Sequence, residues 1–191
     1  MVIQFSGRRI GFAKISIRLC RYFRRHAVLF SPAPNPVHQS AGILATDDRS
    51  FVNGSTDNNP VYATISGNKI DGFQTGIRLH ASGTEPVGLV SATIQNNQIT
   101  GCAKGIVLYD FNGATSGYSA AAVINDNNLS NNSTYGVDAT SLAGSSVNAE
   151  CNWWGTAVGG SISSMVSGPV DYTSWLNSAG TNTNPGFTPT P

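Results

Sequence analysis

The chain has 191 residues, of which 40% are hydrophobic and 11% charged, and its formal net charge is +1 at pH 7. No apolar run approaches the roughly 18 residues that cross a bilayer, so we expect no transmembrane helix. All 10 acidic residues lie beyond residue 30, where only four basic residues accompany them. Because phosphate contacts need Lys and Arg, this acidic body argues against a nucleic acid partner.

Residues 1–30 form a basic segment without any acidic side chain. Lys14, Arg18, Arg21 and Arg25 fall on one helical face, and apolar side chains that include Phe12 fall on another. We favour an amphipathic cap helix here. A membrane-surface element, a targeting peptide and a segment that is not native to the domain remain alternatives. A strand through Ile15, Ile17 and Leu19 also fits the pattern.

Residues 31–62 are expected to form a partial first coil and its loop. Gly42-Ile43-Leu44 resembles the end of a coil, and the segment 45–62 is rich in Asn, Ser and Asp. Three carboxylates in this loop, Asp47, Asp48 and Asp57, offer the oxygen ligands that calcium accepts. An ordinary solvated acidic loop is the alternative interpretation, and no cofactor is otherwise expected.

Residues 63–147 contain one phrase in three versions. ATISGNKI at 63–70 returns as ATIQNNQI at 92–99 and as AVINDNNL at 122–129, each followed by a glycine and an aliphatic residue. The apolar residues alternate, and Gly, Asn or Ser interrupts every apolar run, which indicates short strands rather than helices. A recurring unit of this length predicts an all-β fold, a parallel β-helix of about three to five coils, three of them within 63–147.

Stacking of the coils predicts vertical columns of equivalent residues. The four apolar columns are Ile65, Ile94 and Ile124; Ile70, Ile99 and Leu129; Ile77, Ile106 and Val137; and Leu79, Leu108 and Ala139. A further column is polar, with Asn68, Asn97 and Asn127 followed by Asn152 in the altered fourth copy. A buried amide is costly unless it is hydrogen-bonded. Identical amides on successive coils can bond to one another, so we expect an Asn ladder.

Residues 148–176 are expected to form a capping coil. At Trp154 the second apolar column changes from aliphatic to aromatic, and Trp153 and Gly155 lie beside it. An open solenoid end exposes its core, so these residues, with Tyr172 and Trp175, are interpreted as a structural cap. The alternative is an aromatic platform for sugar rings. Residues 177–191 have the composition of a linker or tail.

The repeats, together with CNWWGT at 151–156 and GPVDYTSWL at 168–176, resemble the right-handed parallel β-helix proteins of the pectin-lyase-like superfamily. The resemblance covers residues 63–176. It implies a location outside the cell or at its surface, where such an end closes the β-helix before a linker and further domains. It also implies a polysaccharide or a cell-surface glycan as partner, since members include lyases, hydrolases, epimerases, adhesins and surface proteins without known chemistry.

The outward columns decide between these activities, because fold alone does not. The predicted columns place no two carboxylates on adjacent coils, whereas acid–base cleavage of a glycosidic bond needs two carboxyls within roughly 5–10 Å. Asp71 with Lys69 and Arg78 is the best charged cluster in a single coil, although ordinary solvated charges explain it equally. We therefore predict no catalytic and no metal-ligating residues, and leave the binding residues unassigned.

Two functions follow from this sequence. The first is a non-catalytic module of an exported or surface protein, with a structural, adhesive or glycan-contacting role. The second is the C-terminal part of a polysaccharide lyase, hydrolase or epimerase whose catalytic coils lie upstream.

Overall fold

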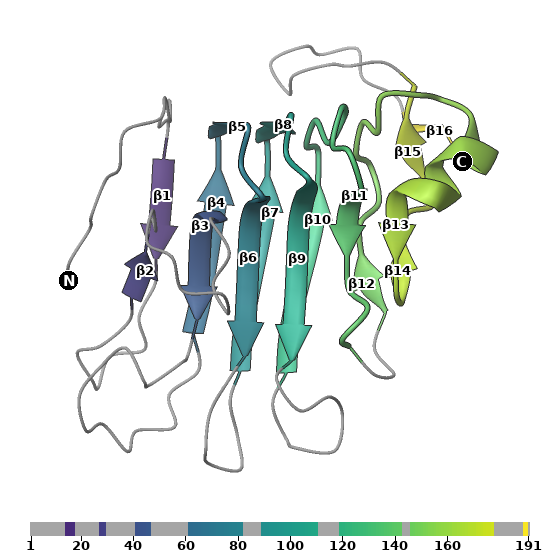
Figure 1. The fold of residues 1–191 in the computed structure, drawn as a ribbon. Coiled ribbons are helices and arrows are strands. Elements are labelled where there is room, and N and C mark those ends of the chain that lie inside the picture. The colour runs from purple at the N-terminus through teal and green to yellow at the C-terminus, as the bar shows by residue number, and fades with distance from the viewer. Residues whose placement is uncertain are drawn as a thin grey trace.

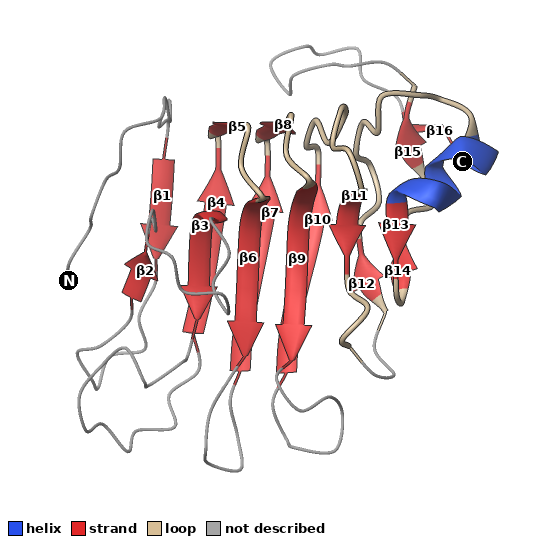
Figure 2. Ribbon diagram, in the orientation of Figure 1, coloured by secondary structure: helices blue, strands red, loops and turns tan. Residues whose placement is uncertain are grey.

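The computed structural model describes residues 14–17, 27–29, 41–46, 61–81, 89–110, 119–142, 146–177 and 189–190. Within them the chain is mostly strand, and most of the strands stack side by side in two sheets of six (Figures 1 and 2). No helix in these ranges is long and apolar enough to cross a membrane. The predicted all-β solenoid is confirmed.

Each coil contributes one strand to each sheet and a short corner between them. The first sheet contains, in spatial order, β1 (Lys14–Ile17), β4 (Val61–Ser66), β7 (Leu89–Gln95), β10 (Ser119–Asn125), β12 (Val147–Asn148) and β14 (Val170–Asp171). The second contains β13 (Val166–Ser167), β11 (Tyr135–Asp138), β9 (Lys104–Asp110), β6 (Thr75–Ala81), β3 (Ala41–Thr46) and β2 (Ala27–Leu29). The corner holds β5 (Lys69–Asp71) and β8 (Gln98–Thr100), and bridges extend it to Asn128 and Trp153.

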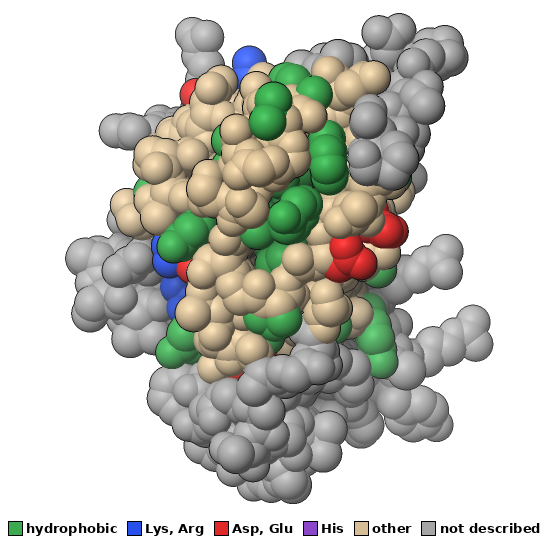
Figure 3. Space-filling view, turned by 90° about the vertical axis from the view of Figure 1, so that its right-hand side faces the viewer, with side chains coloured by type: hydrophobic (Ala, Val, Ile, Leu, Met, Phe, Trp, Pro, Cys, Tyr) green, Lys and Arg blue, Asp and Glu red, His purple; other side chains and the backbone are tan. Residues whose placement is uncertain are grey.

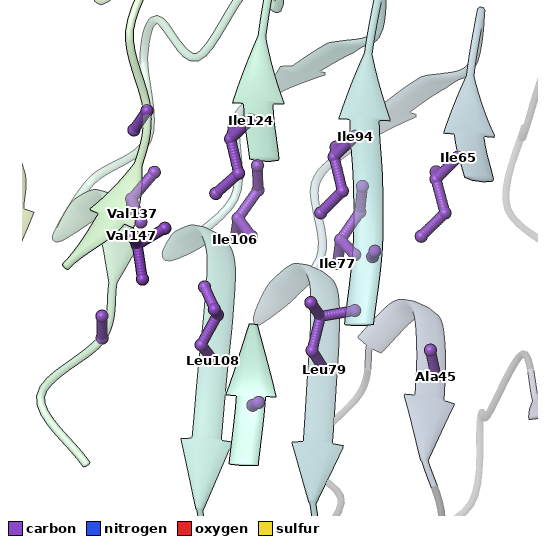
Figure 4. Packing of buried hydrophobic residues seen from close by; sticks show 14 of the residues in the cluster. Ala45, Ile65, Ile77, Leu79, Ile94, Ile106, Leu108, Ile124, Val137 and Val147 are labelled. Carbon is purple, nitrogen blue, oxygen red and sulfur yellow. The ribbon is translucent and has the colours of Figure 1, made fainter. Parts of the chain in front are cut away.

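The pairing of equivalent strands is parallel and in the register that the repeats predict. In the first sheet Ile65 lies opposite Ile94, and Ile94 opposite Ile124. In the second sheet Ile106 lies between Ile77 and Val137. All four predicted apolar columns are buried in the core. Figure 4 shows members of the columns that the two sheets contribute, such as Ile94 and Ile106. Alternation along each strand therefore sends one set of side chains into the core and the other to the outer face.

The two ends of the solenoid are built differently from its middle. At the N-terminal end, β1 and β2 pair antiparallel with β4 and β3. Of the segment 1–30, which was expected to hold a cap helix, only these two strands are described, and β1 agrees with the strand alternative through Ile15 and Ile17. The rest of that segment lies outside the described residues.

At the C-terminal end the chain leaves the repeat. A short helix α1 (Gly159–Ile162) and a 3₁₀ turn (Ser163–Met165) precede β13, and Ile162 is fully buried in the core cluster. The strand β15 (Trp175–Leu176) then pairs antiparallel with β16 (Pro189–Thr190). These elements lie together beyond the last regular coil (Figure 1).

Candidate functional site

A row of buried amides runs along the inside of the corner. Asn97 Oδ1 accepts hydrogen bonds from the backbone N–H and from Nδ2 of Asn68, at 3.0 Å each. Asn127 and Asn152 repeat the arrangement one and two coils further on. Each Nδ2 also donates to the carbonyl two residues earlier in its own chain. These bonds join the four amides that the sequence places in one column, and they fix the corner of every coil.

The first amide of the ladder differs from the others. Asn68 is 2% exposed, and its Oδ1 has no hydrogen-bond partner in the structure. The remaining three Oδ1 atoms each accept two N–H groups from the preceding coil. The ladder is therefore satisfied at its C-terminal end and has a spare acceptor at its N-terminal end.

The two adjacent tryptophans of the last coil lie on opposite sides of the strand. Trp154 is 1% exposed and belongs to the core cluster, next to Leu129 in the second apolar column. Trp153 pairs with Asn128 on the outer side of the corner and is partly exposed. Gly155 follows with a φ of 95°, and a side chain there would come within 3.1 Å of the Cβ of Ser130. Of the two tryptophans in the predicted cap, Trp154 is thus buried in the core and Trp153 is only partly buried.

The other aromatic residues of the predicted cap pack on the core from the C-terminal end. The ring of Tyr172 meets Trp154 edge-on at 6.4 Å between centroids, and Trp175 lies 6.4 Å from Tyr172. Trp175 Nε1 donates to the carbonyl of Ala157. Figure 3 faces this end and shows apolar side chains distributed among polar ones. Partly exposed apolar residues here include Met165, Val166 and Val170.

The outer face of the second sheet carries an ion pair. Lys104 Nζ lies 2.6 Å from Asp138 Oδ2, and the other oxygen of Asp138 accepts from the backbone and hydroxyl of Thr140. Burial alone would raise the pKa of Asp138, but the bonds from Lys104 and Thr140 outweigh it and hold this pKa below its ordinary value. The Asp138 carboxylate therefore links two neighbouring coils through its contact with Lys104.

A second group on this sheet combines a cation with aromatic rings. The Arg78 guanidinium lies 4.9 Å from the centre of the Tyr109 ring, and the His80 ring meets the same tyrosine edge-on at 5.0 Å. Burial lowers the pKa of Arg78, while the charge interaction with Tyr109 raises it by a smaller amount. Arg78 and His80 point away from the core cluster, so the face is charged and aromatic.

The outer face of the first sheet has a different character. On β4, β7 and β10 the outward side chains alternate with the buried ones and are all uncharged, whereas the exposed Asp171 lies in β14 of the same sheet. We call the following nine residues the Tyr62 face: Tyr62, Thr64, Ser66, Ser91, Thr93, Gln95, Ala121, Val123 and Asn125. Tyr62 and Val123 are its most exposed members, at 45% and 46%. The face is rich in hydroxyl and amide groups and has one exposed aromatic ring, that of Tyr62.

The charged residues Lys69, Asp71 and Arg78, which the sequence places in a single coil, have no hydrogen bond or ion pair with one another. Lys69 and Asp71 are exposed on the outer side of β5, and Asp71 accepts a hydrogen bond from the hydroxyl of Thr100 on the next coil. Arg78 lies instead over Tyr109. Within the described ranges no His, Cys, Asp or Glu residues gather in a group that would hold a metal. The loop carboxylates Asp47, Asp48 and Asp57 lie outside the described residues.

Two features of the outer surface were missed by the sequence patterns. Tyr62 precedes the repeated phrase, and its neighbours on the next coils, Ser91 and Ala121, do not resemble it. Extending the alternation back by two residues from Thr64 would have found it. Lys104 and Asp138 lie on adjacent coils but in different columns, since Lys104 is opposite Tyr135 and Asp138 is opposite Val107. Aligning equivalent positions of the repeats therefore does not find their contact.

The described part of the chain is thus a parallel solenoid with a charged outer face on the second sheet, the uncharged Tyr62 face on the first sheet and an aromatic end. No protein-family model, no curated protein and no solved structure matches it.

Proposed function

We propose that this chain is a non-catalytic β-helix module of an exported or cell-surface protein, related to the pectin-lyase-like superfamily, and that the Tyr62 face contacts a glycan. The location and the superfamily rest on the resemblance of the repeats and of the CNWWGT and GPVDYTSWL segments. The contact surface rests on one structural observation, the uncharged Tyr62 face with its exposed aromatic ring.

The spacing of the Tyr62 face suits a repeating ligand. Successive coils are about 4.8 Å apart, and outward side chains on one strand recur at about 6.6 Å. The short hydroxyl and amide groups, such as Thr64, Thr93 and Asn125, both donate and accept hydrogen bonds. Tyr62 stands beside the small side chain of Ser91, and Ala121 follows on the next coil, which leaves room beside its ring. Flat aromatic rings pack well against the apolar faces of sugars.

Two acidic side chains of the second sheet have structural partners, which favours a non-catalytic role. Asp138 bonds to Lys104 and Thr140, and Asp110 Oδ1 accepts the backbone N–H of Ala120 across 2.7 Å. Burial raises the pKa of Asp110, and the bond from Ala120 opposes that rise. Both carboxylates hold strand ends in place.

The proposal is tested by measuring the affinity of the purified chain for soluble xylan, mixed-linkage β-glucan and polygalacturonate in affinity gels. We expect retardation by at least one polysaccharide and no release of reducing or unsaturated products. Tyr62→Ala should weaken that binding about tenfold, the equivalent of about 1.4 kcal/mol.

Val158→Ala is the matched control, because Val158 is an apolar side chain that is 62% exposed and lies outside the Tyr62 face. Its binding should equal that of the unmodified chain. Equal losses in the two variants would refute the role of the tyrosine ring, and measurable product release would refute the non-catalytic assignment.

A further inference from the structure

Trp153 occupies an outward position in the strand register of the corner. The outer column there runs through Lys69, Gln98 and Asn128 before it reaches Trp153, whereas Trp154 continues the buried column. The backbone bonds fix this phase, because Leu129 N–H donates to the carbonyl of Trp153 at 2.7 Å and Trp153 N–H donates to the carbonyl of Asn127 at 2.9 Å. Rotation of the indole into the core would require the strand to slip by one residue.

The contacts of the last coil separate Trp153 from the structural aromatic residues. Among the partly buried aromatic side chains of this coil, Tyr172 and Trp175 pack against the core cluster and Trp153 does not. The part of the Trp153 ring that stays in contact with water adds nothing to the hydrophobic stabilisation of the fold. Closing the core is the work of Trp154, Tyr172 and Trp175, so Trp153 is free for another role.

Polar side chains precede Trp153 in the same outer column of the corner. Asn128 lies one coil away, about 4.8 Å along the axis, and Gln98 lies one coil further. Asn128 Oδ1 is already engaged by the backbone and hydroxyl of Ser130, at 3.0 and 2.7 Å. That engagement orients the amide and leaves Nδ2 as a donor.

Two acidic residues in the adjacent turns bear on the kind of ligand. Asp126 and Glu150 lie in the turns just before Asn128 and Trp153, and both contribute to raising the pKa of the nearby Cys151 thiol, behind the larger effect of burial. The same carboxylates would repel a uronate or another acidic sugar. An uncharged sugar meets no such repulsion.

We propose that Trp153, with Asn128 and Gln98, forms a binding subsite for a neutral sugar ring at the C-terminal corner of the solenoid. The ring of the sugar stacks on the indole, and its hydroxyls bond to the two amides. This subsite extends the proposed glycan contact to a second surface and does not depend on the Tyr62 face.

The test is isothermal titration of the full chain with cellohexaose, chitohexaose, xylohexaose and trigalacturonate. We expect one or more neutral oligosaccharides to bind and Trp153→Ala to weaken that binding at least tenfold. Trp153→Phe should retain part of the affinity because it keeps a flat ring. Val158→Ser serves as the control, since Val158 is 62% exposed near the same end and should not affect binding.

A second measurement covers the case in which Trp153→Ala does not fold. The bound neutral oligosaccharide should protect the unmodified chain from acrylamide quenching, and this protection should be absent from Trp153→Phe. Unchanged affinity in a folded Trp153→Ala, or a preference for trigalacturonate, would overturn the subsite.

The outcomes also separate this subsite from the Tyr62 face. A loss in Trp153→Ala with no loss in Tyr62→Ala supports the subsite and refutes the Tyr62 face. The reverse pattern refutes the subsite alone. Failure of all four probes to bind refutes the subsite, while the polysaccharide gels still decide the proposed function.

Discussion

The inside of each corner and the outer faces of the same coils follow opposite rules. On the inside, Asn68, Asn97, Asn127 and Asn152 repeat one residue type through four coils, and each bonds to the next. On the outside, Arg78, Val107 and Asp138 share one column and have nothing in common chemically. A residue type that repeats in one column from coil to coil therefore indicates a stacking contact. Columns in which the residue type differs show where a coil is free to acquire a function.

The largest expected effect comes from breaking the ladder. Asn97→Leu removes donors to Ile65, Gln95 and Asn127 and leaves the amide of Asn68 without its acceptor. Unsatisfied buried polar groups within a network are expensive, so we expect a loss of about 3–5 kcal/mol in the free energy of unfolding. Urea denaturation followed by circular dichroism measures it.

The control for the ladder is Asn128→Leu, one residue after the ladder residue Asn127 on the next coil. Asn128 is half-buried, and its Oδ1 bonds only within its own turn, to Ser130. We expect a loss of at most about 1 kcal/mol. Comparable losses for the two variants would contradict the distinction between the inner and outer sides of the corner.

The next effect tests how closely the coils approach in the second sheet. A Cβ added at Gly105 would lie 2.5 Å from the carbonyl oxygen of Gly136 and 2.8 Å from Nδ2 of Asn132. Because the first of these atoms is backbone, Gly105→Ala forces two coils apart, and we expect a cost of about 2–3 kcal/mol. The midpoint of thermal unfolding should fall accordingly.

Gly160→Ala is the matched control for this substitution. Gly160 lies in α1, and nothing lies within 4 Å of an added Cβ there. Alanine is also the better helix former, so stability should stay the same or rise by about 0.5 kcal/mol. If Gly160→Ala destabilised the chain as much as Gly105→Ala, the close approach of the coils at Gly105 would not be the reason for the cost.

The sequence predicts the inside of this molecule far better than its outside, for a physical reason. A buried position tolerates few side chains, so isoleucine recurs at Ile65, Ile94 and Ile124 and the column can be recognised in the sequence. Outer positions have no such constraint. The sequence therefore treated Trp153 and Trp154 as one cap, whereas the strand register sends them to opposite sides.

Contacts between side chains at different phases are a second limit on sequence prediction. Lys104 reaches Asp138 because a long, flexible amine spans the distance between coils, and no column contains both residues. The same holds for Asp110, whose carboxylate receives the backbone N–H of Ala120 across the loop between β9 and β10. Only the folded geometry brings such partners together.

The smallest effect concerns the charged outer face and depends on pH. The pKa of Asp138 is held below its ordinary value of 3.8, so the ionised form is favoured by folding. This contribution is fully present above pH 3.8 and is lost as the pH falls through the lower pKa of the folded state. Because the Lys104 side chain is 36% exposed and screened by water, we expect Asp138→Asn to cost only about 1 kcal/mol at pH 7.

The difference between Asp138→Asn and the unmodified chain should then shrink as the pH is lowered below about 4, where the carboxylate loses its charge in both states. Urea denaturation at a series of pH values measures this. Asp171→Asn is the control, because Asp171 is exposed and accepts only from the backbone of Thr173, a bond that an amide oxygen can also accept. If the difference in the free energy of unfolding stayed constant at every pH, Asp138 would contribute through packing and neutral hydrogen bonds rather than through its charge. The outer ion pair would then resemble the inner Asn ladder, which stabilises the coils without charge.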